Sequence, residues 1–422
     1  MSQYIDQADV IVIGGGVIGA SVAYHLTKSG ISDVLVLERN ELASGASARS
    51  AGCFTHSRSD VSTIRMINRT REAIAELEEI LGEPFGFHQH GSVRAVFSEP
   101  RLQEMAAMET VMRTAGLGVR EIDIHEASEL VPWLKLDNAV RTIFVPEDGY
   151  ADGALLATSY LRAARLSGAR VRRGVNVTGL IAEDGEIVGA ETEEGPIRSR
   201  WVVSAAGVWG ISVAGSINFG FPGAPTRSHY WITKPDGTGR PGQPNVQLPD
   251  VRAYFRSEVG GLLVGLQEPQ SRTYDPLQLE EDMGHMNLFD DAYDLDLLVE
   301  QASALEPIIP DVVKWGFAHH IAGLSMYTPD GKFVVGRPDG TSGLIVAGGC
   351  CGSGLAASGG FGQVVADMIS GRSPSIDTSL YDPNRFGKVE PASQEFRERC
   401  AAARSSKSRG NLNLPSSLVA AQ

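Results

Sequence analysis

The chain has 422 residues, of which 42% are hydrophobic and 21% charged, and a net charge of −14 at pH 7. A chain of this length exceeds what one hydrophobic core usually supports, so we expect two domains. The acidic balance argues against nucleic acid or an anionic membrane as partner, and no apolar run approaches the ~20 residues that span a bilayer.

The first nine residues and the four cysteines indicate the compartment of the protein. Acidic side chains stand near the start, where a secretory signal would carry basic ones, so we expect a cytoplasmic protein. Cys53, Cys350, Cys351 and Cys400 show neither C-x-x-C nor Cys/His spacing. We therefore predict no metal site and, in a reducing compartment, no structural disulfide.

Residues 10–28 carry the first motif. A short β-branched run, 10–13, leads into the glycine sequence 14–19, and residues 20–28 have helical character. In this strand–turn–helix context Gly14 permits a tight turn, and Gly16 lets a pyrophosphate lie against the backbone. Gly19 lets helix and strand pack closely, and the helix N-terminus offers free N–H groups to a phosphate. The pattern predicts a dinucleotide site.

The segments that follow favour FAD over a nicotinamide cofactor. A second apolar strand ends in Glu38, where an acid can accept hydrogen bonds from an adenosine ribose. Regular strand–helix repeats do not follow. Instead a small-residue loop occupies 39–52, an apolar strand at 201–207 ends in small residues, and a glycine loop lies at 347–360. Segments scattered so widely suit a long ligand such as FAD.

Six motifs in order resemble the FAD-dependent D-amino-acid oxidase superfamily, and within it the branch of sarcosine and dimethylglycine oxidases and dehydrogenases and glycine oxidase. Together they span residues 9 to about 371. They are the N-terminal fingerprint and the segments 44–52, 145–149, 202–209, 322–331 and 345–360.

The resemblance implies an α/β fold with two domains: a Rossmann-like FAD-binding domain interleaved with a substrate domain built on a mixed, largely antiparallel sheet. We expect the FAD-binding domain to comprise residues 1–84, 146–217 and 312–372, and the substrate domain 85–145 and 218–311. Strand-like segments at 92–97, 229–233 and 261–265 agree with this division. A polar C-terminal extension, 373–422, is expected to be flexible.

The same resemblance implies the residues that bind FAD, which we expect to be held without a covalent link. They are Gly14, Gly16, Val17, Ile18, Gly19, Glu38, Arg39, Gly45, Ala46, Ser47, Arg49, Ser50, Ala51, Gly52, Val177, Ala206, Gly207, Trp209, Gly323, Gly349, Cys351, Gly352, Ser353, Gly354 and Leu355.

The predicted reaction is oxidation of the C–N bond of an amine or amino acid, with an N-alkylated or opine-like amino acid favoured. A hydride passes to flavin N5, and the imine is then hydrolysed. O₂ or another electron acceptor, and homo- or hetero-oligomeric assembly, stay open. Two alternatives remain: a 2-hydroxy-acid or polyol dehydrogenase, and a flavin subunit of a larger electron-transfer complex.

Several positions depart from the family pattern. Ser325 stands where glycine oxidase-like proteins place the carboxylate-binding arginine, and Ala356 occupies the slot of a substrate-binding lysine. Leu263 replaces a lysine that helps O₂ react, which makes oxidase activity doubtful. Arg49 replaces the histidine that links flavin covalently in dimethylglycine enzymes. We therefore predict an unusual substrate anchor.

Five residues are candidates for the catalytic roles. Tyr254 resembles the active-site tyrosine of the dimethylglycine branch, and His229 lies one position from a histidine of that branch. Tyr327 precedes a loop expected to pass over the flavin, and His56 and Arg58 follow the loop 44–52 closely enough to reach the ring.

The double cysteine lies in the glycine loop before a helix expected to run to about residue 370. Backbone N–H groups at that helix N-terminus would stabilise negative charge on the reduced flavin. We expect Cys351 to contact the flavin and Cys350 to pack in the interior.

Overall fold

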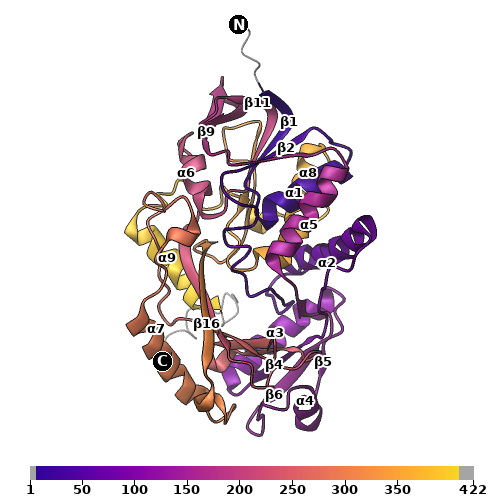
Figure 1. The fold of residues 1–422 in the computed structure, drawn as a ribbon, viewed down its shortest axis with the longest axis vertical. Coiled ribbons are helices and arrows are strands. Elements are labelled where there is room, and N and C mark those ends of the chain that lie inside the picture. Colours follow the sequence, from indigo (N-terminus) through magenta and orange to yellow (C-terminus); the bar gives the residue numbers. More distant parts are fainter. Residues whose placement is uncertain (1–5, 408–422) are drawn as a thin grey trace.

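The computed structural model describes residues 6–407. Its strands, as far as the chain is described, form two eight-stranded sheets and one two-stranded pair. Figure 1 shows the first sheet in the upper part of the molecule and the second in the lower part, with α2 between them. The predicted α/β class, with a Rossmann-like unit and a second, largely antiparallel sheet, is confirmed.

The first sheet has the order β17-β18-β11-β1-β2-β8, and the β9–β10 hairpin joins it at β11. The strands from β18 to β8 are parallel; residues 10–13 of β1, 34–37 of β2 and 344–347 of β18 are continuous apolar runs buried on both faces, whereas the edge strand β8 is polar and partly exposed. Its members are β1 (Asp6–Ile13), β2 (Val34–Glu38), β8 (Arg170–Arg173), β9 (Val177–Glu183), β10 (Glu186–Thr192), β11 (Ile197–Ser204), β17 (Val334–Gly336) and β18 (Leu344–Gly348).

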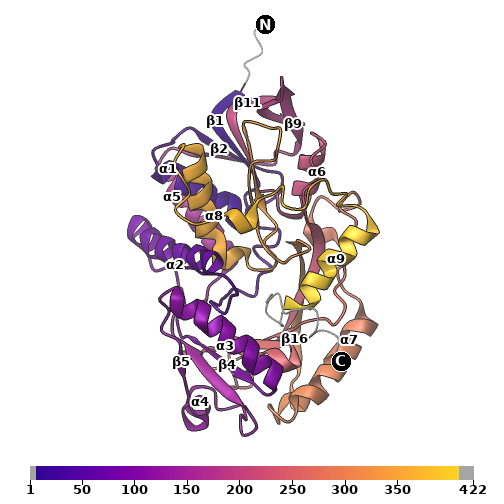
Figure 2. The ribbon, with the colours of Figure 1, turned by 180° about the vertical axis from the view of Figure 1, so that it is seen from behind.

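A layer of helices covers one face of this sheet (Figures 1 and 2). It consists of α1 (Val17–Lys28), α2 (Val61–Leu81), α5 (Gly153–Leu166) and α8 (Gly354–Ile369). The helix α8 packs against α1 and α2. Its approach to α2 leaves no room for a side chain: a Cβ on Gly359 would lie 2.6 Å from Thr70 Cα, and a Cβ on Gly360 would lie 2.3 Å from Met66 Cβ. Glycine at these positions therefore fixes the spacing of the helix layer.

The second sheet has the order β16-β12-β15-β14-β13-β4-β6-β5 and is antiparallel except where β13 meets β4. Its members are β4 (Ser92–Val96), β5 (Arg120–Glu121), β6 (Arg141–Val145), β12 (Ala224–Thr233), β13 (Asn245–Leu248), β14 (Ala253–Glu258), β15 (Gly261–Leu266) and β16 (Phe317–Tyr327). Two apolar clusters cover it, to which α3 (Glu99–Thr114) and α7 (Asp291–Leu305) contribute.

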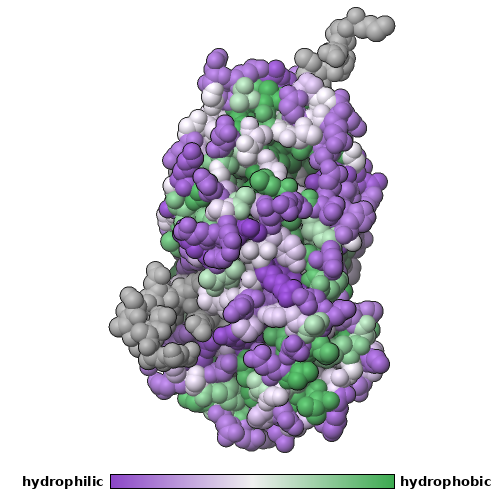
Figure 3. Space-filling view, turned by 90° about the vertical axis from the view of Figure 1, so that its left-hand side faces the viewer, coloured by the Kyte–Doolittle hydropathy of each residue, from purple (hydrophilic) through white to green (hydrophobic). Residues whose placement is uncertain are grey.

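The remaining elements are short. They are β3 (Cys53–Phe54), β7 (Gly149–Tyr150), α4 (Ile124–Leu130), α6 (Gly210–Gly215), α9 (Gln394–Ser405) and the 3₁₀ turns Gly207–Trp209, Pro249–Val251, Met283–His285, Val312–Lys314 and Ser379–Tyr381. None of the described helices is long and apolar enough to cross a bilayer. On the face shown in Figure 3, hydrophilic and hydrophobic side chains are interspersed.

Two expectations need correction. The predicted division placed residues 312–372 in the FAD-binding part, but β16 pairs with β12 along its length in the second sheet. An apolar run identifies a strand and not the sheet it joins, so the sequence could not place it. The remaining domain boundaries stay a prediction.

The second correction concerns the extension 373–422, which we expected to be flexible. Residues 394–405 form α9, which packs on β12 and β16. Its apolar face repeats at Phe396, Cys400 and Ala403, a helical spacing hidden in a polar composition. Residues 408–422 lie outside the described part of the chain.

The glycine contact between α8 and α2 is testable. Gly359→Ala is expected to destabilise the protein by about 2–3 kcal/mol, because the methyl group meets the backbone of α2 and not a side chain that can move. Gly215→Ala in α6 is the matched control, since its Cβ would have no neighbour within 4 Å. Denaturant unfolding of the two variants measures their free energies of unfolding. Equal free energies would show that α2 and α8 can move apart with little loss of stability.

Candidate active site

A cavity of about 410 Å³ is lined by residues of both sheets, of the N-termini of α1 and α8, and of the end of α9. This volume is in the usual range of small-molecule and cofactor sites. The cavity brings together segments from residue 13 to residue 407, which lie far apart in the sequence.

The glycine turn after β1 forms one end of the cavity. Gly14 has φ +105°, a conformation that favours glycine, and its N–H donates to Leu37 O at 2.8 Å. The helix α1 starts at Val17, whose N–H donates to Ser47 Oγ at 3.0 Å, and its cap residue Gly16 supplies no side-chain hydrogen bond. A Cβ on Gly16 would meet only Ser47 Oγ, at 3.4 Å. The space above Gly16 is therefore open to a ligand.

Glu38 is held in position at the end of β2. Its Oε2 accepts from Gly15 N at 2.7 Å and its Oε1 from Asn40 N at 2.8 Å. The Arg39 guanidinium lies 4.1 Å from the centroid of the Trp209 ring, and all three side chains line the cavity. An oriented carboxylate beside a stacked aromatic ring suits an adenosine.

The small-residue loop after β2 is braced by Arg49. Its Nη1 donates to Ser44 O and, at 3.1 Å, to Gly45 O. Its side chain also fills the space beside Gly323 of β16, where a Cβ would lie 3.0 Å from Arg49 Cβ. Arg49 thus links the loop to the second sheet while lining the cavity.

The glycine loop before α8 forms the opposite end. Ser353 caps α8 without a side-chain hydrogen bond, and Gly349, Gly352 and Gly354 line the cavity. A Cβ on Gly352 would lie 2.6 Å from the hydroxyl of Tyr327, so backbone and phenol meet directly. A helix N-terminus placed here favours negative charge on a ligand.

The two cysteines of this loop exchange their predicted places. Cys350 lines the cavity, whereas Cys351 does not. The Cys351 Sγ lies 3.5 Å from Thr328 Oγ1 and 3.2 Å from Gly349 O, and its φ of +48° turns the side chain into the interior. Nothing in the sequence signals the left-handed backbone at Cys351. Burial raises the pKa of both thiols.

All the predicted cofactor residues line the cavity except Cys351 and Gly19. Gly19 has the packing role that its spacing indicates, since a Cβ there would lie 2.0 Å from Gly14 O. The open turn at Gly16, the fixed Glu38 carboxylate and the two helix N-termini fit a long anionic dinucleotide such as FAD.

Three of the five catalytic candidates, Arg58, Tyr254 and Tyr327, line the cavity near the start of α8; His229 also belongs to the lining, but its side chain is fully buried and faces His320 and Asp294. The Tyr254 ring lies on Gly265 of the neighbouring strand β15, where a Cβ would be 1.9 Å from the ring. Burial raises the pKa of Tyr327 to about 12 and that of Tyr254 further. Both phenols therefore stay protonated near neutral pH and can donate a hydrogen bond.

His56 is the fifth candidate, and the structure places it outside the cavity lining. Its ring is fully buried, with Nδ1 2.6 Å from Asp148 Oδ1 and Nε2 3.1 Å from Asn68 Oδ1. Because partners within the protein occupy both ring nitrogens, we no longer count His56 among the catalytic candidates. Its proximity in sequence to the loop 44–52 was misleading, because β3 turns the chain inward.

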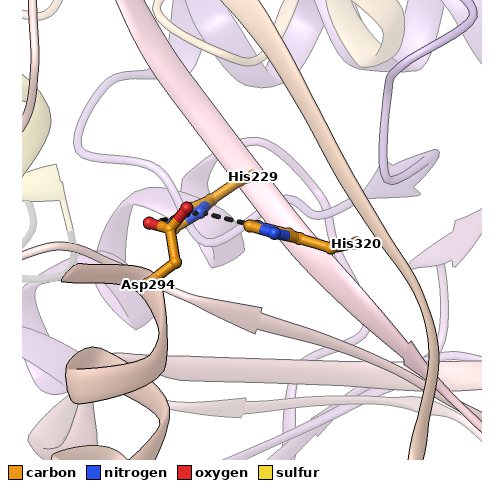
Figure 4. A group of neighbouring side chains, drawn as sticks. All are labelled: His229, Asp294 and His320. Carbon is orange, nitrogen blue, oxygen red and sulfur yellow. Dashed lines mark hydrogen bonds and ion pairs between the residues drawn. The ribbon is translucent and has the colours of Figure 1, made fainter. Parts of the chain in front are cut away.

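His229 is supported by a buried charged group (Figure 4). Its Nδ1 lies 3.1 Å from His320 Nε2, and Asp294 approaches from α7. Burial, and then the nearby Arg227 cation, lower the pKa of His229 to about 2, so its ring is neutral. Its Nε2 is buried without a hydrogen-bond partner among the described residues.

His229, Asp294 and His320 offer three ligand atoms within 4.8 Å of one another. The fully buried Arg227 already donates to Asp294 Oδ1 at 2.7 Å and to Oδ2 at 3.1 Å, and it also pairs with Glu268. A guanidinium therefore neutralises these carboxylates, and we assign the group to the support of β12, β16 and α7.

Several cavity residues were missed from the sequence. Arg94 is buried and donates to Gln247 Oε1 at 2.6 Å, and both line the cavity. An arginine inside the apolar strand 92–96 is a signal that could have identified it. Arg404 and Lys407 also line the cavity, but they come from the segment expected to be flexible.

Comparison with known proteins identifies the family and the fold. The sequence profile of the DAO family, described as FAD dependent oxidoreductase, matches residues 9–368. Human mitochondrial dimethylglycine dehydrogenase is 30% identical over 399 residues, which cover 92% of this chain and 45% of that protein. Mouse mitochondrial sarcosine dehydrogenase is 30% identical over 387 residues, with coverages of 90% and 41%.

The chain thus spans less than half the length of these two relatives. Among solved structures, L-proline dehydrogenase from P. horikoshii superposes with a TM-score of 0.79 at 25% identity, covering 92% of this chain and all of that one.

The open space at Gly16 yields a test of the cofactor site. Gly16→Val is expected to fold, because φ −75° and ψ 178° suit valine and only Ser47 Oγ is near. Its side chain would occupy the space where a phosphate approaches, so FAD content after purification should fall at least ~10-fold, the loss of one charge-assisted contact. Flavin absorbance per protein measures it, and circular dichroism checks the fold. Full FAD content would place the pyrophosphate elsewhere.

Proposed function

This chain belongs to the DAO family of FAD-dependent oxidoreductases, and from that premise we propose that it oxidises the C–N bond of an N-alkylated amino acid to an imine, which water then hydrolyses. The activity is a proposal because the two N-methyl amino-acid dehydrogenases described above are about twice as long as the part matched here. A bound FAD would supply the acceptor for the hydride, which carries the electron pair of the substrate C–H bond.

The observation that carries the proposal is the convergence of two sets of residues in one cavity. The predicted FAD-binding segments line it, and Arg58, Tyr254 and Tyr327 line the same space near the start of α8. A substrate held among these three side chains would lie beside the cofactor, as hydride transfer requires.

Arg58 and the two tyrosines supply polar groups and not a base. The Arg58 Nη2 donates to Ser353 Oγ at 3.3 Å, and its Nε is buried without a partner among the described residues. The raised pKa of Tyr254 and of Tyr327 keeps both phenols neutral. We assign Tyr254 and Tyr327 to orienting the substrate by donated hydrogen bonds.

The positive charge of the cavity determines in which protonation state the substrate nitrogen binds. The nitrogen must be neutral when the hydride leaves, because its lone pair forms the C=N bond. A cavity that contains Arg58 disfavours a second cation, so it lowers the pKa of a bound ammonium. We propose that the substrate binds as the neutral amine and releases its proton to solvent.

We propose that FAD is bound without a covalent link, because Arg49 occupies the linking position and is engaged with Ser44 and Gly45. Leu263 is buried outside the cavity lining, which supports a dehydrogenase that uses an acceptor other than O₂. The cytoplasm remains the proposed location, since the four cysteines are free, as a reducing compartment requires.

Anaerobic reduction of the bound flavin tests the reaction. The holoenzyme is mixed with N-methyl amino acids, opines, D-amino acids and 2-hydroxy acids, and flavin bleaching is followed before air is admitted. We expect bleaching by an N-alkylated amino acid and slow recovery in air. Bleaching by hydroxy acids alone would contradict the C–N assignment, and fast peroxide formation would contradict the dehydrogenase.

The orienting role of Tyr254 has its own test. Tyr254→Phe keeps the ring on Gly265 and removes the hydroxyl, so we expect the rate of flavin reduction by the best amine to fall ~10–100-fold, the value of one hydrogen bond to a polar substrate. Tyr293→Phe, on α7 outside the cavity lining, is the control. Equal rates in the two variants would remove Tyr254 from the site.

A further inference from the structure

The helix α9 lies beyond the residues that the family profile matches, which end at 368. It packs on β12 and β16, and Figure 2 shows it alongside β16 in the lower half of the molecule. Phe396, Cys400 and Ala403 form its buried face, in contact with Tyr327 and Ala224. This packing brings the end of α9 to the cavity.

Two cations at the end of α9 face the cavity. Arg404 is 4% exposed; its Nε donates to Ser228 Oγ at 3.3 Å, and its Nη1 is buried with no hydrogen-bond partner among the described residues. The Lys407 Nζ donates to Cys351 O at 2.8 Å and lies 5.9 Å from the centroid of the Tyr327 ring. Both side chains therefore reach the place where the catalytic candidates meet.

The cations at this end of the cavity have no carboxylate partner in the described part of the chain. Arg58, Arg404 and Lys407 donate to backbone carbonyls and hydroxyls, and none is within 4.0 Å of a carboxylate in the described part of the chain. Glu38 is the acidic residue of the described cavity lining, and it is held at the opposite end by Gly15. Burying cations without counter-charge is costly, so this end of the cavity favours an anionic ligand.

The positions that anchor a carboxylate in relatives are uncharged here. Ser325 lines the cavity and accepts from Gly352 N at 3.0 Å, and Ala356 lines it too. Arg404 and Lys407 enter the same cavity from α9 and restore positive charge.

We propose that α9 supplies the carboxylate-binding site of this enzyme, with the Arg404 guanidinium and the Lys407 ammonium as its ligands, so that the substrate is an anionic amino acid and not a simple amine. The identity of the reacting bond rests on the proposed function, but carboxylate binding can be measured without any reaction. It makes α9 part of the active site.

A binding titration tests this without turnover. Methoxyacetate and oxydiacetate copy sarcosine and iminodiacetate with an ether oxygen in place of nitrogen, and the corresponding amides lack the charge. Each is titrated into the holoenzyme, and the shift of the flavin absorbance gives the affinity. We expect at least one carboxylate to bind ~10-fold or more tightly than its amide, as charge-assisted hydrogen bonds require.

Arg404→Met should abolish this preference, weakening the carboxylate ~10–100-fold and the amide little. The matched control is Arg399→Met on the exposed side of the same helix, which should keep wild-type affinities. Flavin content and unfolding temperature show that both variants fold. If Arg404→Met keeps the preference, or if neither carboxylate binds better than its amide to the wild type, the proposal is wrong.

Lys407 adds a pH signature. Burial, and then Arg58 and Arg404, lower its pKa to about 7. The other groups that face it are Cys53, Cys351 and Tyr327, whose pKa values burial raises, so Lys407 is the group expected to lose charge as the pH rises from 6 to 9.

Carboxylate affinity of the wild type should therefore fall over this range, and that of Lys407→Met should be low and constant. An affinity that is equally pH-dependent in the variant would exclude Lys407 from the anchor.

The two proposals fail separately. If the preference for carboxylates depends on Arg404 but no amine reduces the flavin, the carboxylate site is supported and the proposed reaction is wrong. If amines reduce the flavin but the preference for carboxylates over amides is unchanged in Arg404→Met, the proposed reaction is supported and the carboxylate site is wrong.

Discussion

The close approach of bare backbone to one central space is the constraint on which the rest of this structure depends. At Gly16 and at Gly352 the chain presents peptide groups where any side chain would fill the cavity or meet Tyr327. The helices α1 and α8 start beside these two points, so their N-terminal dipoles act on whatever occupies the cavity. Glycine contacts deeper in α8 hold the helix layer close enough for this geometry to persist.

The second sheet and α9 complete the cavity with charge. The FAD-binding half of the lining is mostly backbone and small side chains, whereas Arg58, Arg94, Arg404 and Lys407 lie at the other half. On the proposed function, this arrangement separates two tasks: backbone N–H groups and Glu38 would hold the cofactor, and the buried cations would select a substrate by its negative charge. The protonated tyrosines add polarity without adding a base, and the neutral His229 ring is buried beside His320 and Asp294.

Much of the fold and of the cofactor site could be predicted from the sequence, because local rules determine them. The G-x-G-x-x-G turn, the apolar strands of the parallel sheet and the helix after the double cysteine follow from periodicity and glycine spacing, and the structure has them where expected. The assignment to the flavoenzyme family came from six such motifs together.

The remaining features depended on tertiary contacts that no local pattern encodes. The pairing of β16 with β12 is a choice between sheets, and the place of Cys351 depends on one left-handed residue. His56 turned inward because Asp148 and Asn68, distant in sequence, bind its ring. The helix α9 was hidden because its apolar face has three small or isolated members in a polar segment. The substrate end of the site was thus the part least accessible to sequence reasoning.

The most direct test of the whole account compares an N-methyl amino acid with the N-methylamine that lacks its carboxylate, as anaerobic reductants of the bound flavin. The account predicts that the amino acid bleaches the flavin and that the decarboxylated amine does so at least ~10-fold less efficiently, because it forgoes the charge-assisted contact with the α9 cations. Equal reduction by both compounds, or reduction by neither while a 2-hydroxy acid bleaches the flavin, would contradict it.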